Sequence, residues 1–328
     1  MGRAGPAKGL PARPDFSILP NSTAEIHKKT LDTELFCGIL VSSIEFIMNK
    51  LSTAKRVQIV KALVEGNSLR SITRMVGVSI NTVTKLLIDL GNACEQFHDE
   101  HVRNVNAQRV QCDEIWSFCY ARKENVPAEY KGLFGYGDLW TWIGQDADSK
   151  LVLSWLVGRR DAQTAYPFMH DLASRLTSRV QLTTDGLNAY LEATDSAFGT
   201  DIDYARLIKV YGSDPNAEKR YTPPVVVETK VQIVTGDPAI EHISTSFIER
   251  QNLQMRMSMR RFTRLTNGHS KKVENHEHAL AIHYVHYNFA RVQKALGGTP
   301  AMVAGLTDRP WSVEEIVGLL DVAEKKAA

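Results

Sequence analysis

The sequence predicts an α/β protein whose mixed sheet follows an all-α segment, and three observations support this fold class. Residues 31–104 show helical spacing of apolar side chains, interrupted by Gly and by Ser residues suited to start helices. From about residue 108 the pattern changes to short strands that alternate with amphipathic helices. With 328 residues and 43% hydrophobic content, the chain is long enough for two domains with buried cores.

Composition excludes several classes of protein. No apolar run reaches the roughly 18 residues that a membrane span needs. Residues 1–30 are rich in Gly, Pro and Arg and have no secretory signal, so we expect a disordered tail and a cytoplasmic protein with no membrane partner. The four cysteines form no CxxC pair, so a structural zinc site of the usual kind is not expected.

Positive charge is concentrated in two segments of a chain whose net charge is only +2. Residues 50–89 contain seven Lys or Arg and two acids, and residues 249–272 contain seven Lys or Arg and one acid, Glu249. Two basic segments in a near-neutral chain indicate two surfaces that meet phosphate. A solvated helix face is the simpler explanation for any one of them.

Residues 51–91 predict three short helices, and the last two have the spacing of a helix-turn-helix motif. The second begins with Ser68 as N-cap, the third begins with Ser79 as N-cap, and Gly77 supplies the turn between them. In this motif the start of the last helix faces the major groove of DNA. The alternative is a plain helical hairpin within a bundle. The side chains expected to contact DNA are Asn81, Thr82, Thr84 and Lys85.

The segment after residue 105 predicts strand, strand, strand, helix, strand, helix and strand in that order. The turn DADSK joins the second and third strands, and the helix DAQTAYPFMHDLASRL has one apolar face. Three strands, a helix and a fourth strand are typical of a ribonuclease H-like domain. The strands are expected over 109–122, 138–158 (two strands), 179–186 and 204–212, and the helices over 161–176 and 187–198.

These elements divide the chain into four parts. We expect a disordered tail over 1–30, an all-α helix-turn-helix domain over 31–104, a ribonuclease H-like domain over 105–295 and a C-terminal helical tail over 296–328. The polar stretch at about 212–242 is interpreted as an insertion, in which PPVVVETKVQIVTGDP suits a small hairpin.

Three acids occupy the positions at which a ribonuclease H-like domain carries its catalytic carboxylates. Asp113 lies within the first strand in CDEIWSF, Asp185 follows the fourth strand in TTDG, and Glu249 begins a later helix in FIER. Two divalent cations about 3.5–4 Å apart can clamp the attacking and leaving oxygens of a phosphoryl transfer. Since Mg²⁺ prefers carboxylate oxygens, we expect these three acids to bind two Mg²⁺ ions, with Mn²⁺ as a substitute.

Each of these acids has a simpler explanation when it is taken alone. Asp113 can be a strand-end acid, and Asp185 can be an ordinary turn aspartate. Glu249 can complement a helix dipole or pair with a neighbouring arginine. The prediction therefore depends on the joint match of all three acids to the expected order of elements.

Other candidate ligands are not expected to bind metal. Strand alternation points Glu114 to the face opposite Asp113. Asp146 and Asp148 lie in a hairpin turn, where aspartate is common. Four histidines of the helix of mixed polarity expected over 270–293 lack HExxH spacing. We interpret these as packing or phosphate-contact residues: His276, His278, His283 and His286.

The segment 244–264 predicts a helix with two distinct stripes when residues are placed at about 100° intervals. The first stripe is apolar and is expected in the core: Ile248, Met255, Met259 and Phe262. The second stripe puts one acid at the head of side chains that suit phosphates: Glu249, Asn252, Arg256 and Arg260.

Together, CDEIWSF, TTDGLNAY, STSFIERQNLQMRMSMRRFTRLTN and HSKKVENHEHALAIHYVHYNFARVQKALGGTPAMVAG resemble bacterial insertion-sequence transposases of the DDE class. The insertion-sequence-one branch is the most similar, over about 105–318 and the helix-turn-helix. The resemblance implies a catalytic triad of Asp113, Asp185 and Glu249. ERQNLQMR matches the family pattern ERxNLxxR, which implies that Asn252 and Arg256 position DNA.

The resemblance also implies an activity and partners. The protein is expected to bind the ends of a mobile element, to catalyse metal-dependent phosphodiester cleavage and strand transfer, and to associate with the nucleoid. Its partners are then double-stranded DNA and at least one further copy of the chain, since two element ends must be brought together. Two alternatives remain open: a structure-selective nuclease with the same core, and a catalytically silent helix-turn-helix regulator.

Overall fold

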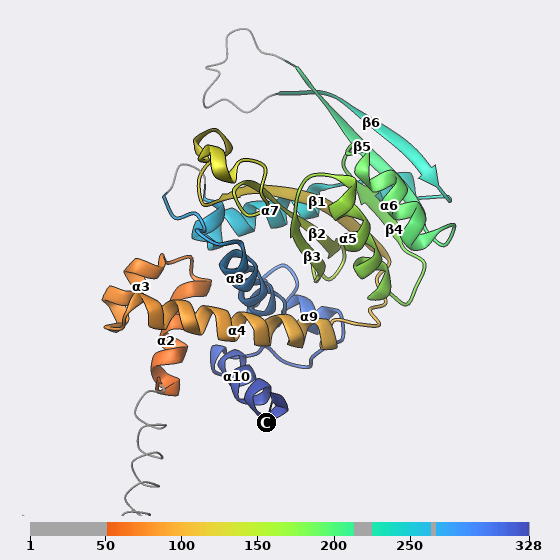
Figure 1. Cartoon of the computed structure of the whole chain (residues 1–328). Helices are drawn as coiled ribbons and strands as arrows, with labels where there is room; N and C mark the ends of the chain where they lie inside the picture. The colour runs from red at the N-terminus through yellow and green to blue at the C-terminus, as the bar shows by residue number, and fades with distance from the viewer. Residues whose placement is uncertain (1–50, 213–224, 264–266, 328) are drawn as a thin grey trace, which may run out of the picture. The chain divides into compact units, whose positions relative to one another are not determined.

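A six-stranded mixed sheet forms the centre of the computed structural model, which describes residues 51–212, 225–263 and 267–327 (Figure 1). The order across the sheet is β3-β2-β1-β4-β5-β6, in which β4 is parallel to both of its neighbours and the other pairs are antiparallel. This confirms the mixed α/β class and is compatible with a ribonuclease H-like arrangement. The strands are β1 (Arg109–Cys119), β2 (Gly137–Asp146), β3 (Val152–Gly158), β4 (Gln181–Thr184), β5 (Asp203–Gly212) and β6 (Val225–Thr235).

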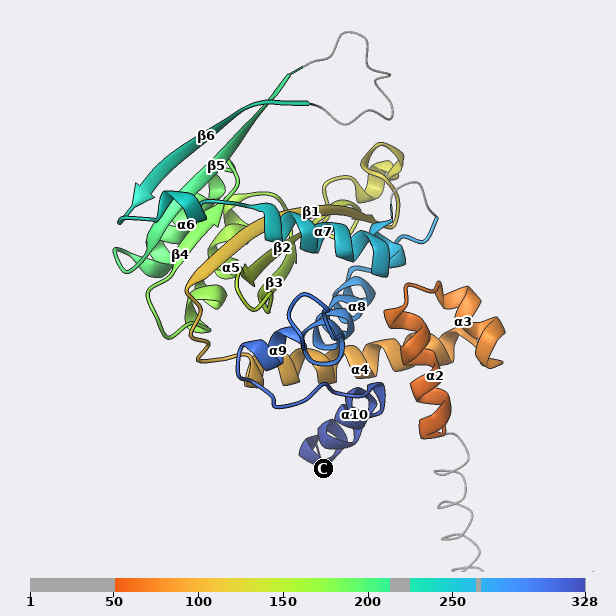
Figure 2. The same cartoon turned by 180° about the vertical axis from the view of Figure 1, so that it is seen from behind.

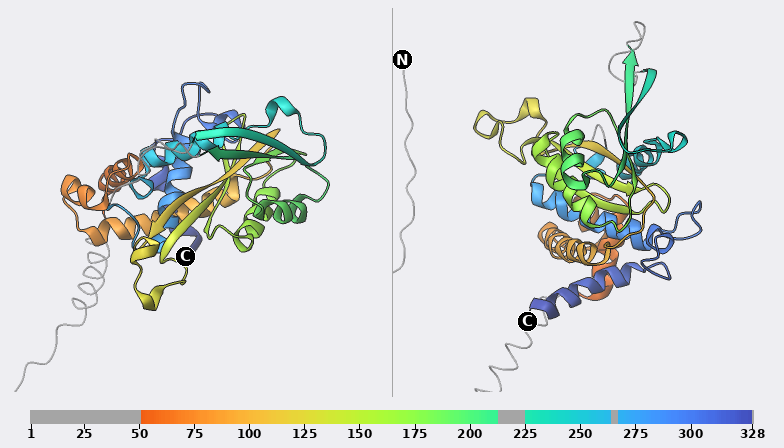
Figure 3. Two further views of the ribbon diagram at one scale, coloured as in Figure 1. Left: turned by 90° about the horizontal axis from the view of Figure 1, so that it is seen from above. Right: turned by 90° about the vertical axis from the view of Figure 1, so that its right-hand side faces the viewer.

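Strand β6 corrects one expectation. The segment 223–238 was expected to form a small hairpin, but its described part contributes a single strand that pairs antiparallel with β5. The side chains of residues 226–234 are all exposed. Residues 227–233 do alternate β-branched with polar side chains, a pattern that suits one long strand as well as the two short strands of a hairpin. Figure 3 shows the β5–β6 ribbon extending past the helices that cover the rest of the sheet.

Helices cover both faces of the sheet (Figure 2). On one face, α5 (Ala162–Ser174) and α6 (Ala189–Phe198) enclose Trp142, which contacts the rings of Phe168 and Tyr190. The other face packs against α7 (Ser246–Ser258) and α8 (Val273–Val285). A short π-helical turn over 286–290 follows α8. The apolar stripe predicted for α7 is buried there, as expected: Ile248, Met255, Met259 and Phe262.

The helices before the sheet begin where the sequence predicts. Ser68 and Ser79 each accept a hydrogen bond from a backbone N–H three residues ahead, at 3.1 Å, and Gly77 has a left-handed φ of 68°. The last of these helices is longer than the short helix expected within 51–91, because it continues to His101. The three helices are α2 (Thr53–Val64), α3 (Leu69–Val76) and α4 (Ile80–His101).

Helix α4 packs along α8, and this contact joins the helical segment to the sheet in one compact unit, Leu51–Ala328. The chain ends with α9 (Pro300–Val303) and α10 (Val313–Ala327), and α10 packs on α2 and α4. None of the described helices is long and apolar enough to cross a membrane. The expectations for residues 1–50 lie outside the described residues, and the domain boundaries near 105 and 296 stay predictions.

The contact between α4 and α8 leaves no room for a side chain at Gly91. A Cβ atom there would lie 2.3 Å from the Cβ atom of His278. We therefore expect Gly91→Ala to lower the free energy of unfolding by about 1–3 kcal/mol, the usual cost of overpacking a core. Urea denaturation measures the change. Gly318→Ala in α10 is the control, because nothing lies within 4 Å of that position. An equal loss of stability in both variants would contradict this explanation.

Candidate active site

The pairing of β1 with β4 places two of the predicted acids side by side. The parallel pairing ends at Cys112 and Thr184, and Asp113 and Asp185 are the next residue of each chain segment. Oxygen atoms of Asp113, Asp185 and Glu114 lie within 4.8 Å of one another. These carboxylates line a cavity of about 820 Å³, whose other walls come from β5 and α7. Crevices at the carboxyl ends of parallel strands are common ligand sites.

Glu114 belongs to this acidic group, which corrects the expectation that it stands apart from Asp113. Its position in β1 does put it on the sheet face opposite Asp113. However, β4 ends at Thr184, so beyond that point no strand lies beside β1 on the β4 side to separate the two faces. Arg160 joins the acids from the β3–α5 connection, because its Nε donates to Glu114 Oε2 (2.9 Å) and its Nη2 donates to Asp185 Oδ2 (3.1 Å).

Glu249 lines the same cavity but does not belong to the group of three carboxylates. Its carboxylate forms an ion pair with Lys209 of β5 and accepts a hydrogen bond from Thr245 Oγ1. The buried side chain of Gln111 in β1 fixes the start of α7, since its Oε1 accepts from two backbone N–H groups of the first turn at 3.0 Å. This contact holds the first turn of α7, and Glu249 within it, at the cavity.

Asn252 orients Asp113 directly. Its Nδ2 donates to Asp113 Oδ2 (2.8 Å), and the backbone N–H of Glu114 donates to Asp113 Oδ1 (2.9 Å). Both oxygens of Asp113 are thus held in one orientation. Arg256, one turn further along α7, also lines the cavity.

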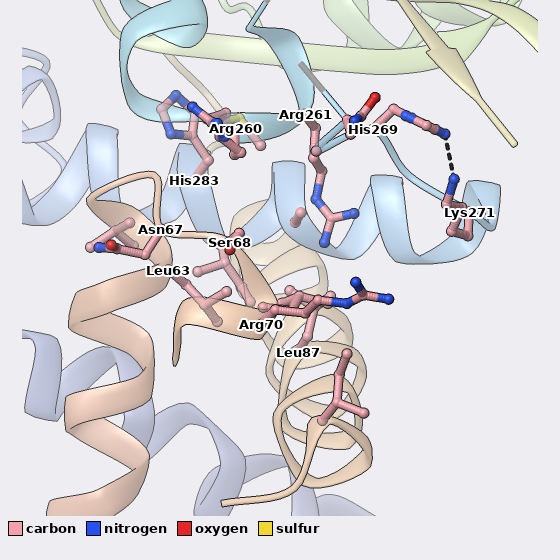
Figure 4. A pocket seen from close by; sticks show the side chains of 18 residues that line it. Leu63, Asn67, Ser68, Arg70, Leu87, Arg260, Arg261, His269, Lys271 and His283 are labelled. Carbon is pink, nitrogen blue, oxygen red and sulfur yellow. Dashed lines mark hydrogen bonds between the residues drawn. The ribbon is translucent and has the colours of Figure 1, made fainter. Parts of the chain in front are cut away.

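Arg260 does not lie at this cavity, although the helical wheel placed it beside Arg256. Helix α7 ends at Ser258, and Arg260 belongs to the short 3-10 turn that follows. It lines a second cavity, shown in Figure 4, together with Arg261. The wheel failed here because it assumes that the helix continues beyond Ser258.

Crowding of negative charge changes the acidity of two carboxyls. Burial, together with the charges of Glu114 and Asp185, raises the pKa of Asp113 to about 7. Burial and the charge of Asp185 raise the pKa of Glu114 to about 7. The pKa values of Asp113 and Glu114 are raised because both carboxyls are buried and negative charge is crowded at this site. A divalent cation would supply the missing counter-charge and would favour the ionised form of these acids. The donor set therefore fits Mg²⁺, with Asp113, Glu114 and Asp185 as the nearest oxygen donors.

The other rejected acids and the histidines have structural contacts. Asp146 accepts hydrogen bonds from two backbone N–H groups of the β2–β3 turn, and Asp148 pairs with Arg109. His276 is buried and hydrogen-bonded to Ser270 Oγ at 3.0 Å, and burial lowers its pKa to about 3. Among the described residues, no histidine belongs to a group suited to hold a metal ion.

The side chains expected to read DNA lie on the first two turns of α4. Asn81 and Lys85 are exposed, and Thr82 and Thr84 are half-buried. Lys85 forms an ion pair with Asp89 at 2.9 Å on the same exposed face. Val83, between them in the sequence, is fully buried in the core. Their contacts with DNA stay a prediction.

Comparisons with known proteins add little. No protein-family model matches the sequence, and no curated protein matches it. One solved structure with similarity to the chain is titled "Crystal structure of a pre-cleavage Mos1 transpososome". It matches with 10% sequence identity and a TM-score of 0.19, over 58% of this chain and 63% of that chain, which is less than two thirds of its length. A match at this level establishes neither family nor function.

Proposed function

We propose that the chain is a DDE-class DNA transposase of a bacterial insertion sequence. It binds the ends of a mobile element and catalyses Mg²⁺-dependent phosphodiester cleavage and strand transfer. The observation that carries the proposal is the meeting of three acids from separate elements on one cavity. Asp113 comes from β1, Asp185 follows β4, and Glu249 comes from the first turn of α7.

The metal-binding residues in this proposal are Asp113, Asp185 and Glu249, with Glu114 beside them. A bound divalent cation supplies charge stabilisation of the phosphodiester and lowers the pKa of a bound water. Asn252 keeps the Asp113 carboxylate in one orientation. Arg160 and Lys209 neutralise Glu114, Asp185 and Glu249 while no cation is bound. Both side chains would be available to phosphate oxygens if a divalent cation were bound to the acids.

The helical segment supplies recognition of the element ends. In the proposal, α3 and α4 form the helix-turn-helix, and α4 reads the major groove with four side chains. Asn252 and Arg256 position the strand at the carboxylates. Two copies of the chain, each holding one element end, form the synaptic complex. The four reading side chains are Asn81, Thr82, Thr84 and Lys85.

Strand transfer with a labelled duplex taken from the DNA that flanks the gene tests this function. We expect a joined product in Mg²⁺ or Mn²⁺ and none in EDTA, because the acids need a divalent cation to hold the reacting phosphate. Cleavage without any joined product would identify a nuclease instead. Binding of the duplex without cleavage in any metal would identify a silent regulator.

A further inference from the structure

The second cavity (Figure 4) has about 780 Å³, and its lining shares no residue with that of the carboxylate cavity. It is bounded by the α2–α3 turn, the start of α4 and the connection between α7 and α8. The described residues that line it include no Asp or Glu, in contrast to the first cavity. Its basic lining consists of Arg70, Arg260, Arg261, Lys271, His269 and His283.

The four Lys and Arg side chains of this cavity have no carboxylate partner in the described part of the chain. Arg261 donates to Ser270 Oγ at 2.8 Å, and burial lowers its pKa to about 10. Lys271 Nζ donates a hydrogen bond to Nε2 of His269 at 2.6 Å. Arginines elsewhere show the contrast, because Arg175 and Arg179 each have two aspartate partners. Arg261 is the most enclosed of the four, and burying its charge without a counter-charge costs free energy that an anionic ligand would recover. The other three are exposed and present their positive charge to solvent.

Most of the remaining lining of the cavity is apolar, with Asn67, Ser68 and Asn267 as its neutral polar residues. The apolar walls consist of side chains from α2, α3, α4, the α7–α8 connection and α8, so the cavity combines a hydrophobic floor with a cationic rim. The sugar–phosphate backbone of DNA complements both surfaces, because its deoxyribose carbons are apolar and its phosphates are anionic. The apolar lining includes Leu63, Leu69, Ile80, Leu87, Met259 and Ile282.

The position of the cavity connects the two functional parts of the molecule. Ile80 is the first residue of α4, and Arg70 lies in the first turn of α3, so the rim adjoins the proposed DNA-reading end of both helices. On the opposite side, the α2–α3 turn meets the end of α7, where a Cβ atom on Gly66 would lie 2.9 Å from the Ser258 carbonyl oxygen. Helix α7 then leads to Arg256 at the carboxylate cavity.

We propose that this cavity binds the backbone of the DNA strand that runs from the α3–α4 reading site toward the carboxylates. Arg70, Arg260, Arg261 and Lys271 bind its phosphates, and the apolar walls receive its sugars. One chain thereby holds the same duplex at its reading helix and at its catalytic acids. This inference rests on the proposed function, and it adds a DNA-binding site that neither α4 nor the carboxylate cavity contains.

The test is the salt dependence of DNA affinity, measured by fluorescence anisotropy with a labelled duplex of about 30 base pairs. EDTA is present throughout, so that cleavage does not interfere. The cavity variant carries Arg70→Gln, Arg260→Gln and Lys271→Gln, three exposed side chains. The control removes three exposed lysines far from the cavity lining: Lys123→Gln, Lys294→Gln and Lys325→Gln.

A plot of log affinity against log salt concentration has a negative slope, and each lost phosphate contact makes that slope shallower by about 0.9. We expect the magnitude of this slope to decrease by roughly 1–3 in the cavity variant and to change by less than about 0.5 in the control. Equal changes in both variants would overturn the inference, because the charges would then act only through the general field. If thermal melting shows that the triple variant is unfolded, Arg260→Gln alone replaces it, with Lys294→Gln as its control.

The binding assay distinguishes failure of the proposed function from failure of this inference. A wild-type protein that binds no duplex even at low salt overturns both the function and this inference. Wild-type binding with unaltered slopes in the cavity variant overturns this inference alone. Because the assay contains no metal ion, a protein without strand-transfer activity can still confirm the cavity as a backbone-binding site.

Discussion

Replacing Asp185 by Asn is expected to lower the rate of strand transfer about 10³-fold. The substitution keeps the shape of the side chain but removes one of the charges that, in the proposed function, would hold a divalent cation beside Asp113. A metal ion contributes several kcal/mol to the stabilisation of a phosphoryl-transfer transition state, and about 1.4 kcal/mol corresponds to a factor of ten in rate. DNA affinity in EDTA should remain close to that of the wild-type protein, because the reading helix α4 is not altered.

Single-turnover strand transfer with a labelled duplex measures this loss. Asp148→Asn is the matched control, since that aspartate lies in the β2–β3 turn and makes an ion pair with Arg109 outside the cavity. It should retain most of the activity. Full activity in Asp185→Asn, together with a normal metal requirement, would show that the carboxylate site is assigned wrongly.

The same assay ranks the two candidates for the third carboxylate. Glu249→Gln is expected to match Asp185→Asn, because Glu249 is the acid that the resemblance assigns to the triad. Glu114→Gln is expected to cost no more than about tenfold, because the resemblance does not assign Glu114 to the triad. The reverse ranking would make Glu114 the third ligand, as its distance to the other two acids allows.

The second large effect is on stability: removing one of the proposed catalytic carboxylates should lower activity but raise the free energy of unfolding. Asp113→Asn is expected to raise the free energy of unfolding by about 2 kcal/mol at pH 8 without divalent metal. The pKa of Asp113 is about 7 in the folded protein, against an ordinary value of 3.8. Each pKa unit corresponds to about 1.4 kcal/mol, and we expect less than the full shift because Asn cannot accept both hydrogen bonds that Asp113 accepts.

The dependence on pH follows from the direction of the shift. Between about pH 4 and pH 7 the folded protein binds a proton at Asp113 that the unfolded chain has released, so wild-type stability falls as pH rises through this window. Glu114 shifts in the same direction and adds to the fall. Asp113→Asn should therefore differ little from the wild-type protein at pH 4 and be clearly more stable at pH 8.

Urea denaturation at several pH values measures this difference, and added Mg²⁺ provides the control. The wild-type protein should gain stability with Mg²⁺ at pH 8, because a ligand that binds only the folded state stabilises it. Asp113→Asn should gain much less. A variant that is less stable than the wild-type protein at pH 8 would contradict the origin assigned to the raised pKa.

Local signals in the sequence predicted those features that depend on local interactions. The N-caps Ser68 and Ser79 form hydrogen bonds three residues away, and Gly77 adopts the backbone angle that only a residue without Cβ adopts easily. The juxtaposition of Asp113 and Asp185 was also predictable. Their strands were recognised in order, and adjacent parallel strands bring their carboxyl ends to the same edge.

Other residues of the site had no local signal. Arg160 follows β3 in a plain arginine pair, and only the β3–α5 connection brings it over Glu114 and Asp185. Nothing in the sequence distinguishes Lys209 from the other lysines. Its role appears only in the fold, where its ammonium group on β5 forms an ion pair with Glu249 of α7. Gln111 is an ordinary polar residue in the sequence of a strand. In the structure it caps the first turn of α7, 136 residues away along the chain.

The sequence by itself determined the class of fold, the order of its elements and the two basic segments, because these depend on spacing and local hydrogen bonds. Only the tertiary structure decided how the acids and bases meet. The end of β4 lets Glu114 join the acidic group, and the end of α7 at Ser258 moves Arg260 into the second cavity. Alternation and the helical wheel assume that an element continues, and where an element ends depends on what packs against it.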